Sequence, residues 1–400
     1  MNQVRRTYLD HAATTPVRPE VFTAMQPMFS EMYGNPSSFY KTGQEAHHIL
    51  DEARASIAAC IGARPTEIFF TSGGSEADNW AIKGTASRFN SKGRHLITTA
   101  IEHHAVLHTM DALQKQGYEI TILPVDSYGL VDPEAVRAAL RPDTILVSII
   151  MANNEIGTIQ PIAEIGKICR EAKVLFHTDA VQAAGALAID VNELNVDLMS
   201  FSGHKFYGPK GVGFLYIRTG VRIDNLIDGG SQERNRRAGT ENMPAIVGMA
   251  KAFELAVAEL ETNACQLTGM RDALIETILE RIPNTRLNGH PTRRLPNNAN
   301  FSFEFIEGES ILLMLDHFGF ECSSGSACTS GSLDPSHVLL AIGLPHEIAH
   351  GSLRVTFGKS NTVEDVPRLV DALVGIVDRL RQMSPLYEPD KQRIQCSSEE

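Results

Sequence analysis

The chain has 400 residues, of which 43% are hydrophobic and 21% charged, and its formal net charge is −12. This length favours two or three domains, and the composition is that of an ordinary globular protein, which excludes a disordered chain. The acidic balance argues against a nucleic-acid-binding face, and no apolar run approaches the ~20 residues of a membrane span.

The N-terminus does not resemble a targeting signal. Arg5 and Arg6 suggest a twin-arginine signal, but residues 7–11 (TYLDH) form no apolar segment behind them. The six cysteines are scattered, without a CxxC pair or zinc-ligand spacing. We therefore expect reduced thiols, a cytoplasmic location and no intrinsic metal site.

Strand-like and helix-like segments alternate over the first two-thirds of the chain. Residues 44–61 carry an apolar stripe at helical spacing. The apolar, β-branched runs predict strands at 68–71, 95–99, 118–125, 144–152, 174–178 and 196–202. This alternation predicts an α/β domain with a mostly parallel sheet and ligands at the carboxyl ends of its strands.

The pattern changes after about residue 260 and predicts a smaller α+β domain. Helices are expected at 264–282 and 310–318, with a strand at 300–305 between them. Thr362 and Asp365 form a weak capping box for a last helix. The predicted division is a large domain over 13–260, and a small domain made of 1–12 and 261–388. The small domain carries a mobile cysteine loop at about 322–333, and a mobile tail is expected at 389–400.

A glycine-rich loop at residues 71–77 (TSGGSEA) joins a predicted strand to a helix. Converging backbone N–H groups and the helix N-terminus suit a phosphate there. By itself the pattern is weak, and a plain strand-to-helix turn is its more common meaning.

Two further strand ends carry chemically suited residues. Asp179 ends an apolar strand, where an unpaired carboxylate is costly, so it either caps a turn or faces a cation such as a protonated pyridine nitrogen. Lys205 follows another buried strand, where desolvation lowers an amine's pKa and prepares it for Schiff-base chemistry. Most lysines are solvated, so the interpretation depends on the combination of Lys205 with Asp179 and the glycine-rich loop.

Small residues surround Cys328 in the segment 323–331 (SSGSACTSG). A structural cysteine normally packs among apolar neighbours, so this thiol suits a nucleophile on an exposed loop. Cys322 is expected to be packed. Arg354 lies in an apolar run and could clamp a carboxylate, or could simply belong to an ion pair.

Together these segments resemble the cysteine desulfurases of the NifS/IscS class, which are fold-type I, pyridoxal-phosphate-dependent transferases. The likeness runs from residues 8–16 (YLDHAATTP) to about Tyr387, and residues 236–242 (RRAGTEN) look closer to NifS than to IscS. Residues 229–233 (GGSQE) depart from the family pattern, because many relatives have a histidine there. No assigned role falls on this stretch.

The resemblance implies a role for each matching residue. Lys205 forms the internal aldimine with pyridoxal 5′-phosphate, His103 stacks on the ring, and Cys328 receives the sulfur. His104 is expected to have no role. The remaining cofactor contacts fall on Asp179 for the ring nitrogen, Gln182 and Asn154 for the ring oxygen, and Gly74, Ser75, Ser202, His204 and Thr240 for the phosphate. Thr240 comes from the other subunit of a homodimer, and Arg354 and Asn35 bind the substrate carboxylate.

The implied activity converts L-cysteine to L-alanine through a persulfide on Cys328, which passes sulfur to an iron–sulfur scaffold or another acceptor protein. Cys328 could also transiently ligate a nascent cluster with that scaffold. Two alternatives remain open: a selenocysteine lyase or other fold-type I aminotransferase, for which Cys328 is dispensable, and a non-catalytic assembly scaffold, which the joint presence of Lys205, Asp179 and Cys328 disfavours.

Overall fold

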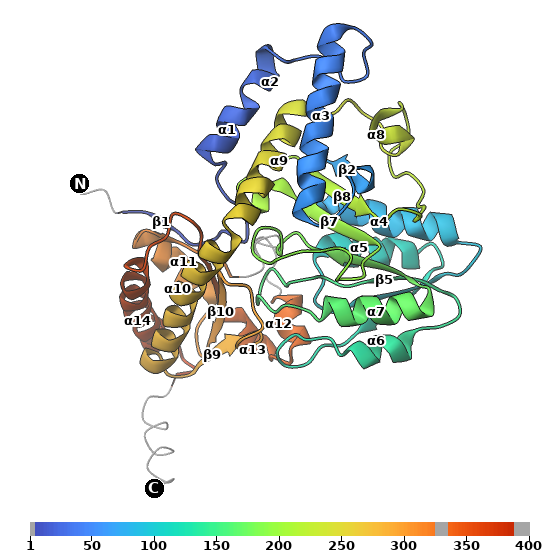
Figure 1. The fold of residues 1–400 in the computed structure, drawn as a ribbon. Helices are drawn as coiled ribbons and strands as arrows, with labels where there is room; N and C mark the ends of the chain where they lie inside the picture. Colours follow the sequence, from blue (N-terminus) through green and yellow to red (C-terminus); the bar gives the residue numbers. More distant parts are fainter. Residues whose placement is uncertain (1–4, 325–334, 388–400) are drawn as a thin grey trace.

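The structure is a computed structural model that describes residues 5–324 and 335–387 (Figure 1). Cys328 lies outside these residues. The predictions of a mobile tail and a mobile cysteine loop concern residues that are not described, so they stay predictions. Within them, no helix is both long and apolar enough to cross a membrane.

A seven-stranded sheet forms the centre of the larger lobe, in the order β2-β8-β7-β6-β5-β3-β4. Its strands are β2 (Ile68–Thr71), β3 (His95–Thr99), β4 (Glu119–Leu123), β5 (Thr144–Ser148), β6 (Leu175–Asp179), β7 (Leu198–Ser202) and β8 (Gly213–Ile217). All neighbours are parallel except β8, which runs antiparallel to both β2 and β7. The fold is therefore the predicted mostly parallel α/β sheet.

Strand β8 is the one element of this sheet that the sequence analysis did not predict. It has five residues and follows directly on Gly208, Pro209 and Gly211, whose turn signals obscure it. All five of its residues are buried between β2 and β7.

Helices cover both faces of the sheet, because alternate side chains of each strand point to opposite sides. Ile68 and Phe70 of β2 belong to the apolar cluster that contains α3, α6, α7 and α9, whereas Phe69 belongs to the cluster that contains α4 and α5. The helices of this lobe are α1 (Pro19–Met25), α2 (Pro27–Ser30), α3 (Lys41–Cys60), α4 (Gly74–Phe89), α5 (His104–Gln114), α6 (Pro133–Ala139), α7 (Ile162–Ala172), α8 (Gln232–Asn235) and α9 (Met243–Ala258). Two 3-10 helices, Pro65–Glu67 and Gly203–Lys205, complete it.

The smaller lobe contains the C-terminal third of the chain and the N-terminal strand (Figure 1). Its antiparallel sheet has the order β12-β10-β9, and β1 pairs in parallel with β11. The elements are β1 (Thr7–Tyr8), α10 (Leu260–Arg281), β9 (Thr285–Asn288), β10 (Asn298–Phe303), α11 (Gly308–His317), β11 (Phe320–Glu321), α12 (His337–Ala341), α13 (His346–His350), β12 (Ser352–Thr356) and α14 (Asp365–Met383). Helix α14 begins at Asp365 rather than at the predicted Thr362, although the Asp365 carboxylate does accept the Thr362 N–H at 3.0 Å.

Separate apolar cores lie in the two lobes. One cluster joins residues between Val21 and Ala256, and another joins Leu9 to residues between Met270 and Val377. These cores support the predicted domain division, which stays a prediction.

Candidate active site

A cavity of about 400 Å³ opens at the carboxyl ends of β6 and β7, between the two lobes. Its wall includes these residues predicted from the sequence: Gly74, Ser75, His103, Asn154, Asp179, Gln182, Ser202, His204, Lys205 and Arg354. Asn35 and Thr240 are exposed and do not line it. Cys328 lies outside the described residues.

Lys205 ends the short 3-10 helix that follows β7, so the buried strand fixes its position. Its Nζ donates to the backbone carbonyl of Ala12 and, at 2.9 Å, to that of Ala13. The amine therefore lies inside the cavity, against the N-terminal segment, and not on the solvated surface.

The glycine-rich loop forms one end of the cavity. Gly73 adopts a φ of +154°, which side chains with a Cβ rarely tolerate, and α4 begins at the next residue. Ser75, Ser202 and His204 surround a hollow at this helix N-terminus. Burial, and then the charge of Lys205, lower the pKa of His204 to about 4, so its ring is neutral at physiological pH. Hydroxyl, imidazole and helix N–H donors line one hollow, which favours an anion-binding loop over a plain turn.

Asp179 lies at the end of β6 and lines the cavity, but it is not part of the hollow at the glycine-rich loop. Its Oδ1 accepts the Val181 N–H at 2.9 Å, so the carboxylate does cap a turn. Burial nevertheless raises its pKa to about 6, although the Val181 N–H and the charge of Lys205 oppose this. A cation placed beside Asp179 would offset that cost, because buried carboxylates are stable when they are paired.

Two further buried carboxyl groups interact electrostatically with Asp179, and the sequence analysis missed both. Asp78 of α4 lines the cavity, and burial, followed by the charges of Asp179 and Glu102, raises its pKa. Among the described residues, Asp78 Oδ1 has no hydrogen-bond partner. Burial raises the pKa of Glu102 to about 8, although its Oε1 accepts hydrogen bonds from Thr99 Oγ1 and the Ile150 N–H.

Glu102→Gln is expected to stabilise the fold progressively as the pH rises from about 4.5 to about 8. In this window the unfolded chain releases the Glu102 proton while the folded chain keeps it, so rising pH favours unfolding of the natural protein by up to about 1.4 kcal/mol per pH unit. Glutamine cannot ionise and keeps an acceptor for Thr99. Denaturant unfolding at pH 5, 6.5 and 8 measures the difference, with the exposed Glu261→Gln as control. A difference that is the same at all three pH values would contradict the argument.

His103 caps the N-terminus of α5, and its Nδ1 accepts the Ala105 N–H at 3.1 Å. In the neutral ring Nε2 therefore carries the proton. Burial, then the charges of Lys205 and the neighbouring histidines, lowers the pKa of His103 to about 4. His104, which was expected to have no role, and His337 also line the cavity, with ring centroids 4.7 Å apart.

Arg354 of β12 brings the smaller lobe to the site. Only 2% of its side chain is exposed, and its guanidinium donates to Asp10 Oδ1 at 2.7 Å and to the Asn154 carbonyl at 3.0 Å. Arg354 therefore does belong to an ion pair, which the sequence left open, and it also lines the cavity.

Comparison with known proteins gives the family of this chain. Residues 7–369 match the family model described as aminotransferase class-V. A cysteine desulfurase IscS from Methanosarcina thermophila is 59% identical over 382 residues, 96% of this chain and 94% of the relative. A solved structure titled NifS-like protein has a TM-score of 0.88 at 40% identity, covering 94% of this chain and 100% of that one. The chain belongs to the cysteine desulfurases, within the aminotransferase class-V family.

This membership confirms the resemblance seen in the sequence and the fold-type I architecture. The closer likeness to NifS than to IscS stays a prediction, since one of these relatives is named IscS and the other NifS-like. Another solved structure, titled SspA in complex with cysteine, has a TM-score of 0.78 at 38% identity, covering 88% of this chain and 98% of that one.

The cysteine desulfurases use pyridoxal 5′-phosphate, and the residues of this cavity fit it. The glycine cradle at α4 suits the phosphate, and the Lys205 amine suits the aldehyde carbon. The buried Asp179 carboxyl, whose ionised form a cation would stabilise, suits a protonated ring nitrogen. A Cβ on Gly74 would come within 2.7 Å of the Val181 side chain, so the cradle depends on glycine. The individual cofactor contacts remain proposals.

Proposed function

We propose that the protein removes the sulfur atom of L-cysteine, holds it as a persulfide on Cys328, and releases L-alanine. The observation that carries this proposal is that the Lys205 amine, the Asp179 carboxyl and the Arg354 guanidinium line one cavity. The residues on either side of the segment that contains Cys328 form hydrogen bonds with residues of the cavity wall.

These attachments are backbone and side-chain hydrogen bonds on either side of residues 325–334. Before that segment, Ser323 exchanges backbone hydrogen bonds with Arg354 (2.6 and 3.3 Å), and the Ser324 carbonyl accepts from Ser352 Oγ. After it, Ser336 Oγ donates to Glu155, which lines the cavity. Cys328 is four residues from Ser324 and eight from Ser336, which supports its access to a substrate in the cavity.

When bound, pyridoxal phosphate supplies an electron sink for the charge that develops at the substrate's Cα. Arg354 holds the substrate carboxylate, and Lys205 Nζ takes the Cα proton. The Asp179 carboxylate would keep the ring nitrogen of the cofactor protonated. The Cys328 thiolate attacks the substrate sulfur, so an S–S bond forms while the C–S bond breaks. The carbon skeleton keeps the electron pair of that bond and takes up protons to become alanine.

Incubation of the purified holoenzyme with L-cysteine and a thiol reductant tests this proposal. Alanine and sulfide should form in equal amounts. Formation of pyruvate in place of alanine would indicate a lyase. Selenium release from selenocysteine without sulfur release from L-cysteine would favour the selenocysteine lyase. A colourless protein with neither product would favour the scaffold.

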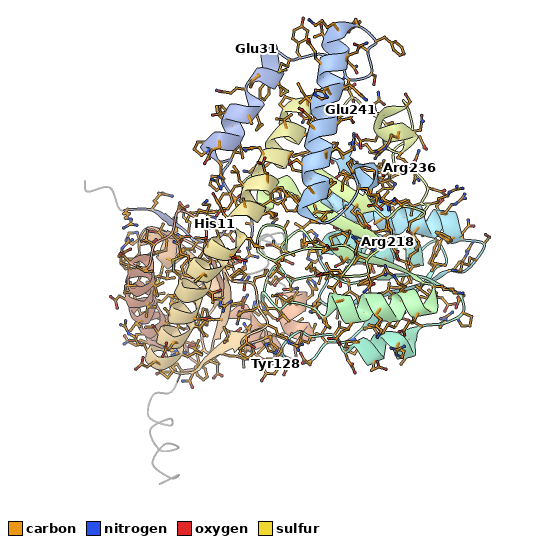
Figure 2. All side chains as sticks on the ribbon, in the orientation of Figure 1. His11, Glu31, Tyr128, Arg218, Arg236 and Glu241 are labelled. Carbon is orange, nitrogen blue, oxygen red and sulfur yellow. The ribbon has the colours of Figure 1, made fainter. Side chains whose placement is uncertain are left out.

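The molecule also carries an exposed apolar face, which we assign to the contact with a second copy of the chain. Large side chains between residues 22 and 40 are solvated, and Tyr33 and Phe39 are 72% and 94% exposed. They belong to the projection formed by α1, α2 and the start of α3, with Glu31 at its tip (Figure 2). Exposed aromatic clusters of this kind mark interaction sites.

The second copy is the favoured occupant because two predicted site residues lie on this side of the molecule. Asn35 lies between Tyr33 and Phe39 in the sequence and is exposed. Thr240 is exposed next to Glu241, whose carboxyl interacts electrostatically with Arg54 and His47 of α3. Neither lines the cavity of its own chain. A homodimer would let each act in the partner's cavity.

Introducing charge on this face should separate the dimer. Tyr33→Glu combined with Phe39→Glu is expected to raise the dimer dissociation constant at least about 100-fold, because two carboxylates would be desolvated in the contact. Sedimentation velocity measures it. Leu313→Glu is the matched control, since Leu313 is 75% exposed on α11 of the other lobe. A dimer that the double variant leaves intact would exclude this face.

The sulfur acceptor is proposed to be a protein, and an iron–sulfur scaffold is the candidate that the family suggests. Passage of labelled sulfur from Cys328 to a purified scaffold protein would support it. The cytoplasmic location and the absence of an intrinsic metal stay predictions of the sequence.

A further inference from the structure

Asp10 forms an ion pair with Arg354 and had no role in the sequence analysis. Its Oδ1 accepts from Arg354 at 2.7 Å, and its side chain is 17% exposed. Arg354, the residue proposed to bind the substrate carboxylate, lines the cavity. An anionic ligand of Arg354 therefore meets a guanidinium that is already paired with Asp10.

The backbone around Asp10 is held in place by hydrogen bonds to the strand that carries Arg354. Asp10 forms an isolated bridge with Thr356, whose N–H donates to the Leu9 carbonyl at 2.7 Å. The Tyr8 hydroxyl donates to the carbonyls of Asp10 and Thr14, at 2.9 and 3.0 Å, and so closes the turn between them. Asp10 thus approaches Arg354 from a hydrogen-bonded segment.

The same short segment contacts the rest of the catalytic apparatus. The Ala12 carbonyl accepts from Lys205 and from Gln182, the latter at 2.9 Å, and Thr14 Oγ1 lies 3.1 Å from His204 Nδ1. Residues 8–15, which we call the N-terminal strap, therefore join the carboxylate-binding side of the cavity to the amine and the phosphate side. At most four residues of the strap separate Asp10 from the residues that contact Lys205, Gln182 and His204.

We propose that Asp10 is a positioning residue that orients Arg354 for the substrate carboxylate and so sets the affinity for α-amino acids over plain amines. This inference rests on the proposed function, in which Arg354 binds that carboxylate. An arginine side chain has several rotatable bonds, and a carboxylate that accepts from one edge of the guanidinium fixes its plane. A guanidinium presents five N–H donors in that plane, which suffice for two carboxylates at once.

The test compares L-alanine with ethylamine, which differ only by the carboxylate, in their binding to the holoenzyme. Asp10→Ala is expected to weaken L-alanine binding about 10- to 50-fold through loss of the charge-assisted contact, and to leave ethylamine binding within about twofold. Asp10→Asn keeps an oxygen acceptor and should show a smaller loss. In turnover, KM for L-cysteine should rise similarly in Asp10→Ala, while kcat changes less than about threefold. The visible absorbance of the bound cofactor reports binding without turnover.

Tyr8→Phe is the matched control, because it removes two hydrogen bonds from the strap without touching Arg354. If Asp10 only stabilised the strap, both variants would weaken L-alanine and ethylamine alike, and the inference would be wrong. Arg354→Lys distinguishes the role of Asp10 from the proposed carboxylate site itself. Selective loss of L-alanine binding in Arg354→Lys but not in Asp10→Ala would overturn the role of Asp10 alone. No selective loss in Arg354→Lys would overturn the proposed carboxylate site itself.

Discussion

Lys205→Ala will lower the rate of alanine formation from L-cysteine by at least about 10³-fold, within the range expected for loss of a positioned acid–base group. Lys205 is the amine in the cavity that the strap carbonyls of Ala12 and Ala13 hold in place. Without it, the Cα proton has no positioned acceptor. The variant should also lack the visible absorbance of a cofactor covalently bound to the protein.

Lys251→Ala provides the control for Lys205→Ala. Lys251 lies on α9 and pairs with Glu254 at 3.3 Å on the surface, so its loss should leave turnover within about twofold. Thermal unfolding of both variants checks that the fold is intact. If Lys205→Ala kept more than a tenth of the natural rate, another group would have to supply the proton transfer.

Cys328→Ala is expected to reduce sulfur release by at least about 10³-fold, because none of the cysteines that the structure describes lines the cavity. The variant should still bind the cofactor and L-alanine with natural affinity, since the described lining of the cavity is unchanged. This combination separates loss of the nucleophile from damage to the site. Loss of cofactor binding in Cys328→Ala would instead indicate a structural role.

Cys322→Ala is the matched control, six residues earlier in the chain. Burial, and then the charges of Asp10 and Glu321, raise the pKa of the Cys322 thiol, so it stays protonated and unreactive at physiological pH. Sulfur release by this variant should remain within about threefold of the natural rate. Equal losses in the two variants would remove the distinction between Cys328 and a packed cysteine.

Residues at the ends of predicted strands were the ones that the sequence could locate. Asp179 and Lys205 each follow a run of apolar residues, and the glycine-rich loop follows another, so their convergence at one edge of a parallel sheet could be expected. The structure brings them together as predicted. Their chemistry and their place in the fold are both local properties of the chain.

Residues whose role depends on tertiary packing were missed. Asp78 lies inside α4 and Glu102 in the loop between β3 and α5, and both are buried by the tertiary packing around the sheet. Asp10 meets Arg354 across 344 positions of sequence. No pattern within either segment indicates the pair. The roles of Asn35 and Thr240 likewise depend on contacts that no local pattern indicates, because their proposed site is in a second copy of the chain.

Mass spectrometry of the holoenzyme after brief incubation with L-cysteine tests the central claim most directly. The account predicts one additional sulfur atom on the peptide that contains Cys328, removable by a thiol reductant, and none on the peptides that contain Cys60, Cys169 or Cys265. Alanine released while Cys328 stays unmodified would contradict it.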